Sequence, residues 1–598
     1  MELPRREKHD LYTRPGQYNE LENRLRNQYV KADLPVLVMY AFDYRTRLGP
    51  FLFTDKTLLP AGPRAVAGAL YSAGFKNLRI VLQEWTPNVL PSRALVGGKP
   101  PALLFISSMQ IHSASAKRLV IDAHRLGKDR PLILAGGAKA IYEPWDFFGL
   151  GAEGQYSADV VVTGEEFVIL ELLERLSANR ADGESMLDAF RRCRREGLLE
   201  DIPGLVFRED DAEDRPPQRL INTGIQRLVQ DLDELPMPTE ALRFLEPPHQ
   251  RSWLARRPLE LDQIQRHATV LSLVTTHGCK FHCPYCPIPA YNQFTFRFKS
   301  PGRLVREITE IAQQTGIATF FGTDDNFFNN RETVEDTFGE MARSKIGRQR
   351  FRDAVFFGTE GTEFDVFKNQ DLLPLARDAG LRGIWFGIED MTAELVKKGQ
   401  SPEKTHTLFK MLRKLGIAPM PMMMHHDGQP LWSWRNLYGL LNQVRFLRRA
   451  GAVSMQVTIL TPSIGSKGYE DPFRNQLVMS RVGGVPIEDF QYDGNYCIAT
   501  EDPHPWRKQL NMFLAYASFY NPVNFLKTSL KIDSLWAYRV TYQLYGMMGV
   551  VRSLNQAKGW LYRLVNGPIE RFQDAPMPRF EMLAPAGVET RLLHYQGV

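Results

Sequence analysis

The stretch that decides the fold is "ATVLSLVTTHGCKFHCPYC" (residues 268–286), in which an apolar run leads directly into three cysteines. The apolar run predicts a buried strand, and Cys279, Cys283 and Cys286 lie on the loop after it. The chain of 598 residues has only five cysteines. A disulfide framework needs an even number of thiols and a structural zinc site needs four ligands, so three close thiols indicate another kind of site.

Strand–helix units continue from this strand along the chain. Helical patterns such as 301–316 and 434–451 separate the apolar runs. The six runs are 268–276, 318–323, 354–360, 383–389, 418–425 and 454–462. Six units predict a full or partial (β/α)6 barrel with its chemistry at the carboxyl ends of the strands, where the cysteine loop would lie.

A second alternation precedes the barrel. Its apolar runs are 35–42, 78–83, 102–108, 131–137 and 159–166, and helical patterns cover 62–74, 113–127 and 165–176. This order predicts an α/β domain with a doubly wound, Rossmann-like parallel sheet that binds ligands at the carboxyl ends of its strands. The charged stretch 208–219 and the proline-rich stretch 233–250 then indicate a connecting segment.

We therefore expect five regions. They are an N-terminal extension (1–30), a Rossmann-like domain (31–180), a connecting segment (181–262), a barrel (263–465) and a mostly helical C-terminal region with a tail (466–598).

Composition excludes several classes of protein. The net charge is +6 without a basic block, so nucleic acid is not an obligatory partner. The polar N-terminus is not a signal peptide. Arg539 and Gln543 interrupt the apolar stretch 534–551, so no transmembrane segment is predicted. We expect a monomeric, cytoplasmic protein that acts on a small-molecule substrate.

Three thiolates suit an iron–sulfur cluster. A cluster with four iron corners normally takes one thiolate at each, so three cysteines leave one iron open for a ligand. Zinc is the alternative. His282 is the nearest fourth ligand, but it lies inside the loop, and no second Cys/His pair follows at finger spacing. An open cluster is therefore favoured over zinc.

The spacing C-x-x-x-C-x-aromatic-C resembles the signature of the radical S-adenosylmethionine (radical SAM) enzymes, which Cys279, Cys283, Tyr285 and Cys286 match. The resemblance implies that the three cysteines hold a 4Fe-4S cluster and that S-adenosylmethionine binds the open iron. An electron donor such as flavodoxin or ferredoxin would reduce the cluster, and cleavage would give a 5′-deoxyadenosyl radical. Tyr285 would lie beside the adenine.

Further matches imply S-adenosylmethionine contacts at later strand ends. Gly322, Asp324 and Asp325 follow the second strand, although an acid here can simply cap the next helix. Glu389 ends "GIWFGIED", which resembles the fourth-strand pattern before a helix with Lys-Gly. Glu360 ends the third strand, where a solvated carboxylate is the alternative.

The N-terminal sheet resembles the cobalamin-binding domain of one radical SAM subgroup. Three strand ends carry this resemblance, within 106–120, 134–144 and 161–173, and the stretches 201–208 and 231–238 resemble the subgroup's linker phrases. The residues implied to approach cobalamin are Ser107, Ser108, Gly136, Gly137, Thr163, Gly164 and Glu165.

One departure concerns the cobalt ligand. Many cobalamin proteins supply a histidine after the first strand, but here "FDYRTRLGP" (42–50) has Arg45, and no histidine occurs between His9 and His112. We predict that no protein histidine coordinates cobalt and that His112 belongs to a helix start.

Other candidates for catalysis are weaker. His425 and His426 end the fifth strand and either serve proton transfer or fill a buried strand. Cys497 either donates a hydrogen atom or packs. The aromatic helices within 505–565 either cover a hydrophobic substrate or pack on the barrel.

The resemblance implies a cobalamin-dependent radical SAM enzyme, and a C-methyltransferase that uses methylcobalamin is the favoured reaction. Cyclisation, ring rearrangement or oxidation without methyl transfer is the alternative. A non-catalytic corrinoid or iron–sulfur binding protein is the alternative from another class.

Overall fold

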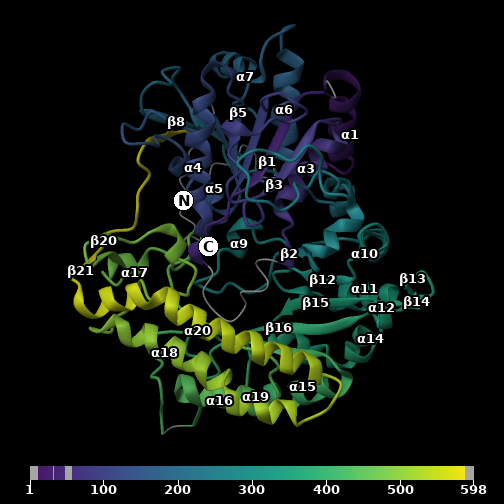
Figure 1. The fold of residues 1–598 in the computed structure, drawn as a ribbon, viewed down its shortest axis with the longest axis vertical. Coiled ribbons are helices and arrows are strands. Elements are labelled where there is room, and N and C mark those ends of the chain that lie inside the picture. Colours follow the sequence, from purple (N-terminus) through teal and green to yellow (C-terminus); the bar gives the residue numbers. More distant parts are fainter. Residues whose placement is uncertain (1–10, 31–32, 47–56, 435, 586–598) are drawn as a thin grey trace. The chain divides into compact units, whose positions relative to one another are not determined.

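The computed structural model describes residues 11–30, 33–46, 57–434 and 436–585 (Figure 1). The chain divides into two compact units. The first is built from the described residues within 1–44, 60–267 and 576–598, and the second from those within 45–59 and 268–575.

An eight-stranded sheet forms the centre of the first unit. In spatial order its strands are β22 (Glu581–Leu583), β8 (Arg219–Asn222), β7 (Leu205–Arg208), β6 (Val160–Val162), β5 (Leu132–Gly136), β4 (Leu103–Ser107), β1 (Val36–Tyr40) and β3 (Leu78–Leu82). The strands from β6 to β3 pair in parallel, and the chain order reverses between β1 and β4. The expectation of a doubly wound sheet is confirmed.

Helices cover this sheet, so its parallel strands are buried almost throughout (Figure 1). The helices are α1 (Gln17–Arg24), α3 (Gly62–Ser72), α4 (Ser113–Ala123), α5 (Ala138–Tyr142), α6 (Glu166–Asn179), α7 (Met186–Arg195) and α8 (Pro238–Leu242). The core includes Leu37, Leu104 and Ile133, whose side chains are fully buried.

The segment 181–262 differs from our expectation of a connection. It contains α7, and its strands β7 and β8 extend the first sheet with antiparallel pairing. The charged run 208–219 is only the loop between these two strands, whose apolar residues lie on either side of it. Part of the expected tail also joins this sheet as β22, parallel to β8.

The second unit is built on a seven-stranded, wholly parallel, open sheet. Its order is β18 (Gln456–Ile459), β17 (Ala418–His425), β16 (Leu381–Glu389), β15 (Phe356–Gly361), β12 (Thr319–Gly322), β9 (Val270–Leu273) and β2 (Leu58–Leu59). Six strands follow chain order, as a partial (β/α)6 barrel requires, which confirms that prediction. The short β2 adds to the edge beside β9, and its two residues gave no periodic signal.

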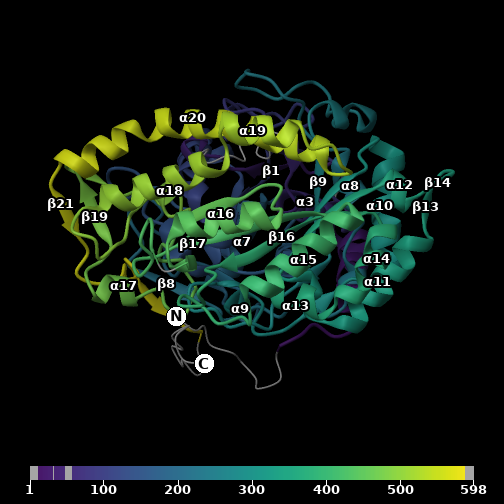
Figure 2. The ribbon, with the colours of Figure 1, turned by 90° about the horizontal axis from the view of Figure 1, so that it is seen from below.

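Helices alternate with these strands and cover the sheet (Figure 2). They are α9 (Ile288–Tyr291), α10 (Pro301–Thr315), α11 (Arg331–Arg343), α12 (Phe351–Ala354), α13 (Glu363–Lys368), α14 (Leu373–Asp378), α15 (Pro402–Leu415), α16 (Leu440–Ala450), α17 (Asp471–Arg474), α18 (Pro505–Phe519), α19 (Pro522–Ser529) and α20 (Trp536–Asn566). Small ladders pair β13 (Lys345–Ile346) with β14 (Gln349–Arg350), and β19 (Met479–Val482) with β20 (Val485–Pro486) and β21 (Ile569–Arg571).

Two expected helices have different bounds. The Lys-Gly stretch after Glu389 is irregular, because α15 begins only where the Ser401 side chain caps the Lys404 N–H and Pro402 takes the first turn. The helix expected over 434–451 begins at Leu440.

The C-terminal helices pack on the barrel. The Tyr516 hydroxyl donates to the Val457 carbonyl at 2.6 Å, and the Tyr520 hydroxyl donates to the Met455 carbonyl at 2.9 Å, which ties α18 to β18. Helices α18 and α19 in turn pack against α20 (Figures 1 and 2). None of the helices in the described ranges is long and apolar enough to span a membrane.

Candidate active site at the cysteine loop

The cysteine loop is enclosed by a short hairpin. Strand β10 (Thr276–His277) pairs antiparallel with β11 (Arg297–Phe298), and the loop and α9 lie between them. Gly278 opens the loop at φ 95°, and a Cβ there would collide with the Thr295 carbonyl. Only glycine permits this close backbone approach, so the residue before the first cysteine is fixed by sterics.

The three thiols lie close together without pairing. All three are free cysteines, and Cys283 is buried. Burial raises the pKa of the Cys279 thiol to about 11 and that of Cys286 to about 12, and the neighbouring Cys283 thiol adds to both shifts. Among the described residues, no three His, Cys, Asp or Glu side chains converge on one point that would hold a single metal ion. Three thiols on one loop fit three corners of an iron–sulfur cluster.

Asp324 supports this loop from behind. Its Oδ1 accepts hydrogen bonds from the backbone N–H groups of Thr275 (3.0 Å) and Thr276 (2.7 Å) and from both threonine hydroxyls. Its Oδ2 accepts from the Thr359 hydroxyl at 2.8 Å, and the side chain is 2% exposed. We expected Asp324 to contact S-adenosylmethionine, but the protein's own donors take both of its oxygens.

Asp325 and Gly322 complete this support. Asp325 Oδ2 accepts from the Gly278 N–H at 2.6 Å and from Asn292 Nδ2 at 3.1 Å, so it links β12 to both ends of the loop. Burial, with the Asp324 carboxylate, raises the pKa of Asp325 to about 6. A Cβ at Gly322 would collide with the Asp324 carboxylate, which explains the glycine.

Glu360 is the carboxylate without a protein partner. It ends β15, is half-buried, and makes no hydrogen bond or ion pair with any described residue. Burial raises its pKa to about 8, and the charges of Asp324, Asp325 and Glu389 act in the same direction. A half-buried acid with no partner among the described residues, at a strand's carboxyl end, fits a polar ligand group such as a ribose hydroxyl or an amino group.

Replacing Glu360 with glutamine is expected to change the pH dependence of stability. Because the folded pKa is raised, the stability from the protonated form is present below the ordinary value of 4.5 and is lost as the pH rises to about 8. Glu360→Gln should therefore unfold at a higher temperature than the parent at about pH 9, with little difference at about pH 4.5. Thermal unfolding across pH measures this, with the exposed Glu335→Gln as control. Equal shifts in both variants would contradict it.

Glu389 is held by a lysine that the sequence reasoning did not assign. It ends β16 with φ 59° at a bulge in the pairing with β17. Lys398 Nζ lies 3.0 Å from its Oε1, and both side chains are largely buried. Burial works against the charge of Lys398, but Glu389 and the thiols Cys283 and Cys279 outweigh it and raise the pKa. The Lys-Gly pattern after the fourth strand was the signal that pointed to this residue.

A cavity of about 160 Å³ adjoins the loop. Pro284 and Tyr285 of the loop line it, together with His425, His426 and Lys508. The Tyr285 hydroxyl is buried without a hydrogen-bond partner in the described part of the chain. Burial, with Glu389 and Cys283 nearby, raises the pKa of Tyr285. A small polar ligand beside the loop would therefore find an unsatisfied hydroxyl.

The two histidines have different surroundings. His425 Nδ1 is 2.9 Å from Gln429 Oε1, its Nε2 is 3.2 Å from Asn511 Nδ2, and burial lowers its pKa to about 3. His426 Nε2 is buried, has no hydrogen-bond partner among the described residues, and lies 3.8 Å from Asp390.

Asp390 remains ionised beside His426. Burial opposes ionisation, but His426 and hydrogen bonds from Thr392 and Gln443 outweigh burial and hold the pKa of Asp390 well below its usual range. His425 therefore has a structural environment, whereas His426 suits proton transfer.

Cys497 does not reach this cavity. It is fully buried, it is absent from the lining, and burial raises its pKa. The structure therefore does not place Cys497 beside the other candidate catalytic residues, His425 and His426.

The residues predicted to approach cobalamin follow three neighbouring strands of the first unit. Ser107 ends β4 and Ser108 follows it, Gly136 ends β5, and Thr163 follows β6. Strand β4 borders the point where the strand order reverses, which is where open parallel sheets form ligand crevices. The Thr163 hydroxyl is 4% exposed and unpartnered among the described residues, so a polar ligand group would satisfy it.

Other residues in this set have structural roles. Gly137 has φ 101°, and a Cβ there would collide with the Ser108 backbone, so its glycine is needed for packing. A Cβ at Gly164 would collide with Gln226, and Glu165 accepts a hydrogen bond from the Val229 N–H at 3.2 Å. We expected all three to approach cobalamin.

The two side chains considered for the position of a cobalt ligand make other contacts within the protein. His112 is buried, and its Nδ1 accepts from the Asp43 N–H at 3.1 Å. Arg45 lies 2.8 Å from Glu488 and its guanidinium is 4.0 Å from the centre of the Phe490 ring. Residues 47–50 of the expected ligand loop lie outside the described residues.

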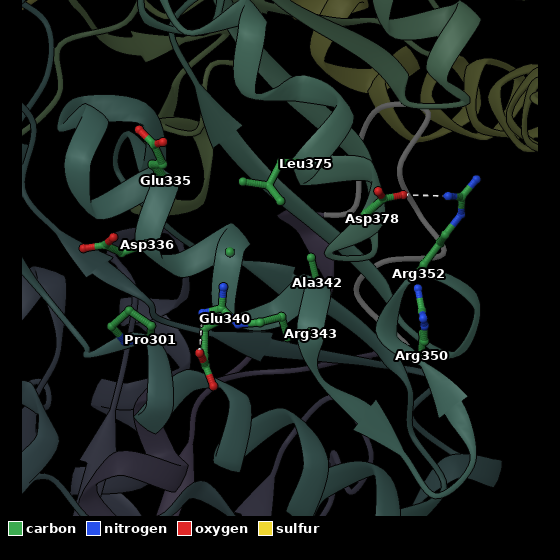
Figure 3. Close-up of a pocket in the computed structure, with 11 residues that line it drawn as sticks. Pro301, Glu335, Asp336, Glu340, Ala342, Arg343, Arg350, Arg352, Leu375 and Asp378 are labelled. Carbon is green, nitrogen blue, oxygen red and sulfur yellow. Dashed lines mark hydrogen bonds and ion pairs between the residues drawn. The ribbon is translucent and has the colours of Figure 1, made fainter.

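A separate surface hollow on the second unit is lined mainly by charged side chains, as is usual for a protein surface. Charged side chains of α11 and α14 line it (Figure 3). Their charges are partly neutralised in two ion pairs, Glu340 with Arg343 at 2.8 Å and Asp378 with Arg352 at 2.7 Å. We assign it no function.

Comparison with known proteins agrees with this geometry. Residues 273–441 match the model of the radical SAM superfamily. Cytidylyl-2-hydroxyethylphosphonate methyltransferase of Streptomyces wedmorensis is 24% identical over 418 residues, which cover 66% of this chain and 72% of that protein.

Two solved structures share the fold. One is the radical S-adenosylmethionine methyltransferase TsrM from Kitasatospora setae with cobalamin and a 4Fe-4S cluster bound. It has a TM-score of 0.54 and 15% identity and covers 87% of this chain and 100% of its own. The other is the cobalamin-dependent S-adenosylmethionine radical enzyme OxsB with aqua-cobalamin and S-adenosylmethionine bound. It has a TM-score of 0.57 and 12% identity and covers 90% of this chain and 73% of its own.

The segment that carries the three-cysteine loop and strands β12 to β17 of the partial barrel therefore resembles the radical SAM superfamily. The fold of the chain is similar to the folds of TsrM and OxsB.

Proposed function

We propose that this enzyme is a cobalamin-dependent C-methyltransferase acting on a small molecule. The proposal rests on one observation: two features occur in the same chain. One is the three-thiol loop at the carboxyl ends of a partial barrel, and the other is a doubly wound sheet that resembles cobalamin-binding domains. The named methyltransferases among its relatives support the choice of reaction.

The cofactors would be held by residues already described. Cys279, Cys283 and Cys286 would hold a 4Fe-4S cluster. Tyr285, Glu360 and Glu389 would contact S-adenosylmethionine, while Ser107, Ser108 and Thr163 would approach cobalamin. When bound, the cluster with S-adenosylmethionine would supply a radical that abstracts hydrogen, and cobalamin would supply a methyl group.

The chain's own residues would position these groups. Asp324 and Asp325 fix the loop, and Lys398 orients the Glu389 carboxylate. His426 lines the cavity beside Asp390 and would take or give a proton there. A pH–rate profile unchanged by His426→Gln would contradict that last role. We further propose a cytoplasmic monomer reduced by a flavodoxin- or ferredoxin-type donor.

Cofactor content and products test the function. Anaerobically reconstituted protein is incubated with hydroxocobalamin and desalted, and we expect about one corrinoid for every four irons. Reduction in the presence of S-adenosylmethionine should then yield both S-adenosylhomocysteine and 5′-deoxyadenosine. 5′-Deoxyadenosine without S-adenosylhomocysteine would favour cyclisation, rearrangement or oxidation instead. Iron without corrinoid would contradict the cobalamin assignment.

Lys398 offers a test that needs no substrate. Lys398→Met should weaken S-adenosylmethionine binding about tenfold, because it leaves the largely buried Glu389 carboxylate without its cation. The measurement is 5′-deoxyadenosine formation against S-adenosylmethionine concentration in the absence of substrate. The neighbouring, exposed Lys397→Met is the matched control. An equal effect of the two changes would show that the Glu389–Lys398 pair has no role.

A further inference from the structure

Helix α20 carries its large apolar side chains on the outside. Its buried stripe contains small or polar residues through the middle of the helix, where a soluble helix normally buries its largest residues. The buried residues are Arg539, Gln543, Gly546, Gly549, Val550, Ser553, Ala557, Trp560 and Leu564. The exposed apolar residues are Trp536, Leu544, Tyr545, Met548, Val551, Leu554, Tyr562 and Val565.

Close helix packing explains this inversion. A Cβ at Gly546 would collide with the Tyr520 ring at the end of α18, so only small residues on this stripe let α18 and α20 approach. The large side chains are consequently turned outward, and Met548 is 60% exposed and Val551 69% exposed.

The neighbouring helix extends the exposed apolar surface. Helix α19 packs on α20, and the most exposed apolar residues of α19 and the turn after it are Val523, Leu526, Leu530 and Ile532. We call these four residues, with the exposed ones of α20, the apolar face. Isolated exposed apolar residues are ordinary on a protein surface, but a set of twelve on two helices that pack together and the turn between them indicates a binding surface.

The charge of this region identifies its partner. Residues 503–567 contain eight Lys and Arg residues and a single acid, Asp533. That acid is engaged, because it lies 2.6 Å from Arg539 and 3.4 Å from Arg413. Exposed cations accompany the apolar face, namely Lys527, Lys531, Arg552 and Lys558. The partner should therefore be apolar and carry negative charge.

We propose that the apolar face docks the enzyme on an anionic lipid bilayer. An interfacial helix with Trp, Tyr and Leu side chains and flanking Lys and Arg has the composition that binds the headgroup region of such a bilayer. A second copy of this chain fits less well, because two faces with the same positive charge would meet. This inference is independent of the chemistry at the cysteine loop.

Vesicle binding tests the proposal with the full-length holoenzyme. We expect co-flotation with phosphatidylcholine vesicles that contain phosphatidylglycerol, weaker binding at high salt, and little binding to phosphatidylcholine alone. Lys527→Gln with Lys531→Gln should weaken binding about 30-fold, since each cation near an anionic membrane contributes about 1 kcal/mol. Met548→Glu with Val551→Glu should weaken it by at least about tenfold.

Control variants separate docking from misfolding. Leu95→Glu changes a comparably exposed apolar residue, 54% exposed in the first unit, and should bind vesicles as the parent does. Every variant must also keep the parent's unfolding temperature and 5′-deoxyadenosine formation. Absence of binding to anionic vesicles, or equal loss in Leu95→Glu, would overturn the proposal. A concentration-dependent dimer that the Met548→Glu/Val551→Glu pair dissociates would instead assign the face to self-association.

Discussion

Replacing Cys283 with serine is expected to abolish 5′-deoxyadenosine formation. We expect the rate to fall about a thousandfold or more, which is typical when a residue essential to the reacting group is removed. Cys283 is the most buried of the three loop thiols, and it lies close enough to Cys279 and Cys286 to raise the pKa of both. A serine hydroxyl is a poor ligand for iron, so the loop would retain two thiolates and bind the cluster weakly. Cys279→Ser and Cys286→Ser should behave in the same way.

Iron and sulfide content after anaerobic reconstitution, together with the visible spectrum, measures the loss directly. The matched control is Cys193→Ala, which removes a buried thiol from α7 in the first unit and should leave the iron content unchanged. Full iron content in Cys283→Ser, or an equal loss in Cys193→Ala, would mean that the loop is not the cluster site.

The sequence predicted well those strands that pair in parallel. Parallel strands are buried on both faces, so runs such as "VLVMY" in β1 and the whole of β17 are nearly continuous apolar stretches. The cysteine loop was equally visible, since its spacing is local. Neither depends on which distant segment packs nearby.

The remaining features depend on contacts that local patterns do not contain. Asp324 was assigned to the cofactor because it follows a strand, but the threonines that donate to its oxygens lie 48 or 49 residues earlier in the chain and, for Thr359, 35 residues later. Strands β7 and β8 were hidden by the charged loop between them. For α20 the sequence did not indicate a buried side, and the packing of Gly546 against Tyr520 shows which side faces inward.

The supporting role of Asp324 leads to the second large effect. Asp324→Ala is expected to destabilise the second unit by about 5 kcal/mol, because it leaves two backbone N–H groups and three threonine hydroxyls without their acceptor in a buried site. This loss would lower the unfolding temperature by roughly 10 °C for a unit of this size. In this variant β10 would lose its anchor at the start of the cysteine loop. The iron content after reconstitution should therefore be lower than in the parent, even at temperatures at which the variant is still folded.

Two variants separate the hydrogen bonds from charge and from nonspecific damage. Asparagine keeps the shape of the side chain and its Oδ1 acceptor, and burial raises the pKa of Asp324, so Asp324→Asn should keep most of the stability. Its Oδ1 can still accept from Thr275 and Thr276, while its amide can donate to the Thr359 hydroxyl. The exposed Asp336→Ala on α11 should change the unfolding temperature little. If Asp324→Ala matched Asp336→Ala in both unfolding temperature and iron content, Asp324 would not hold the loop in place, and a direct contact with the cofactor would again be its best assignment.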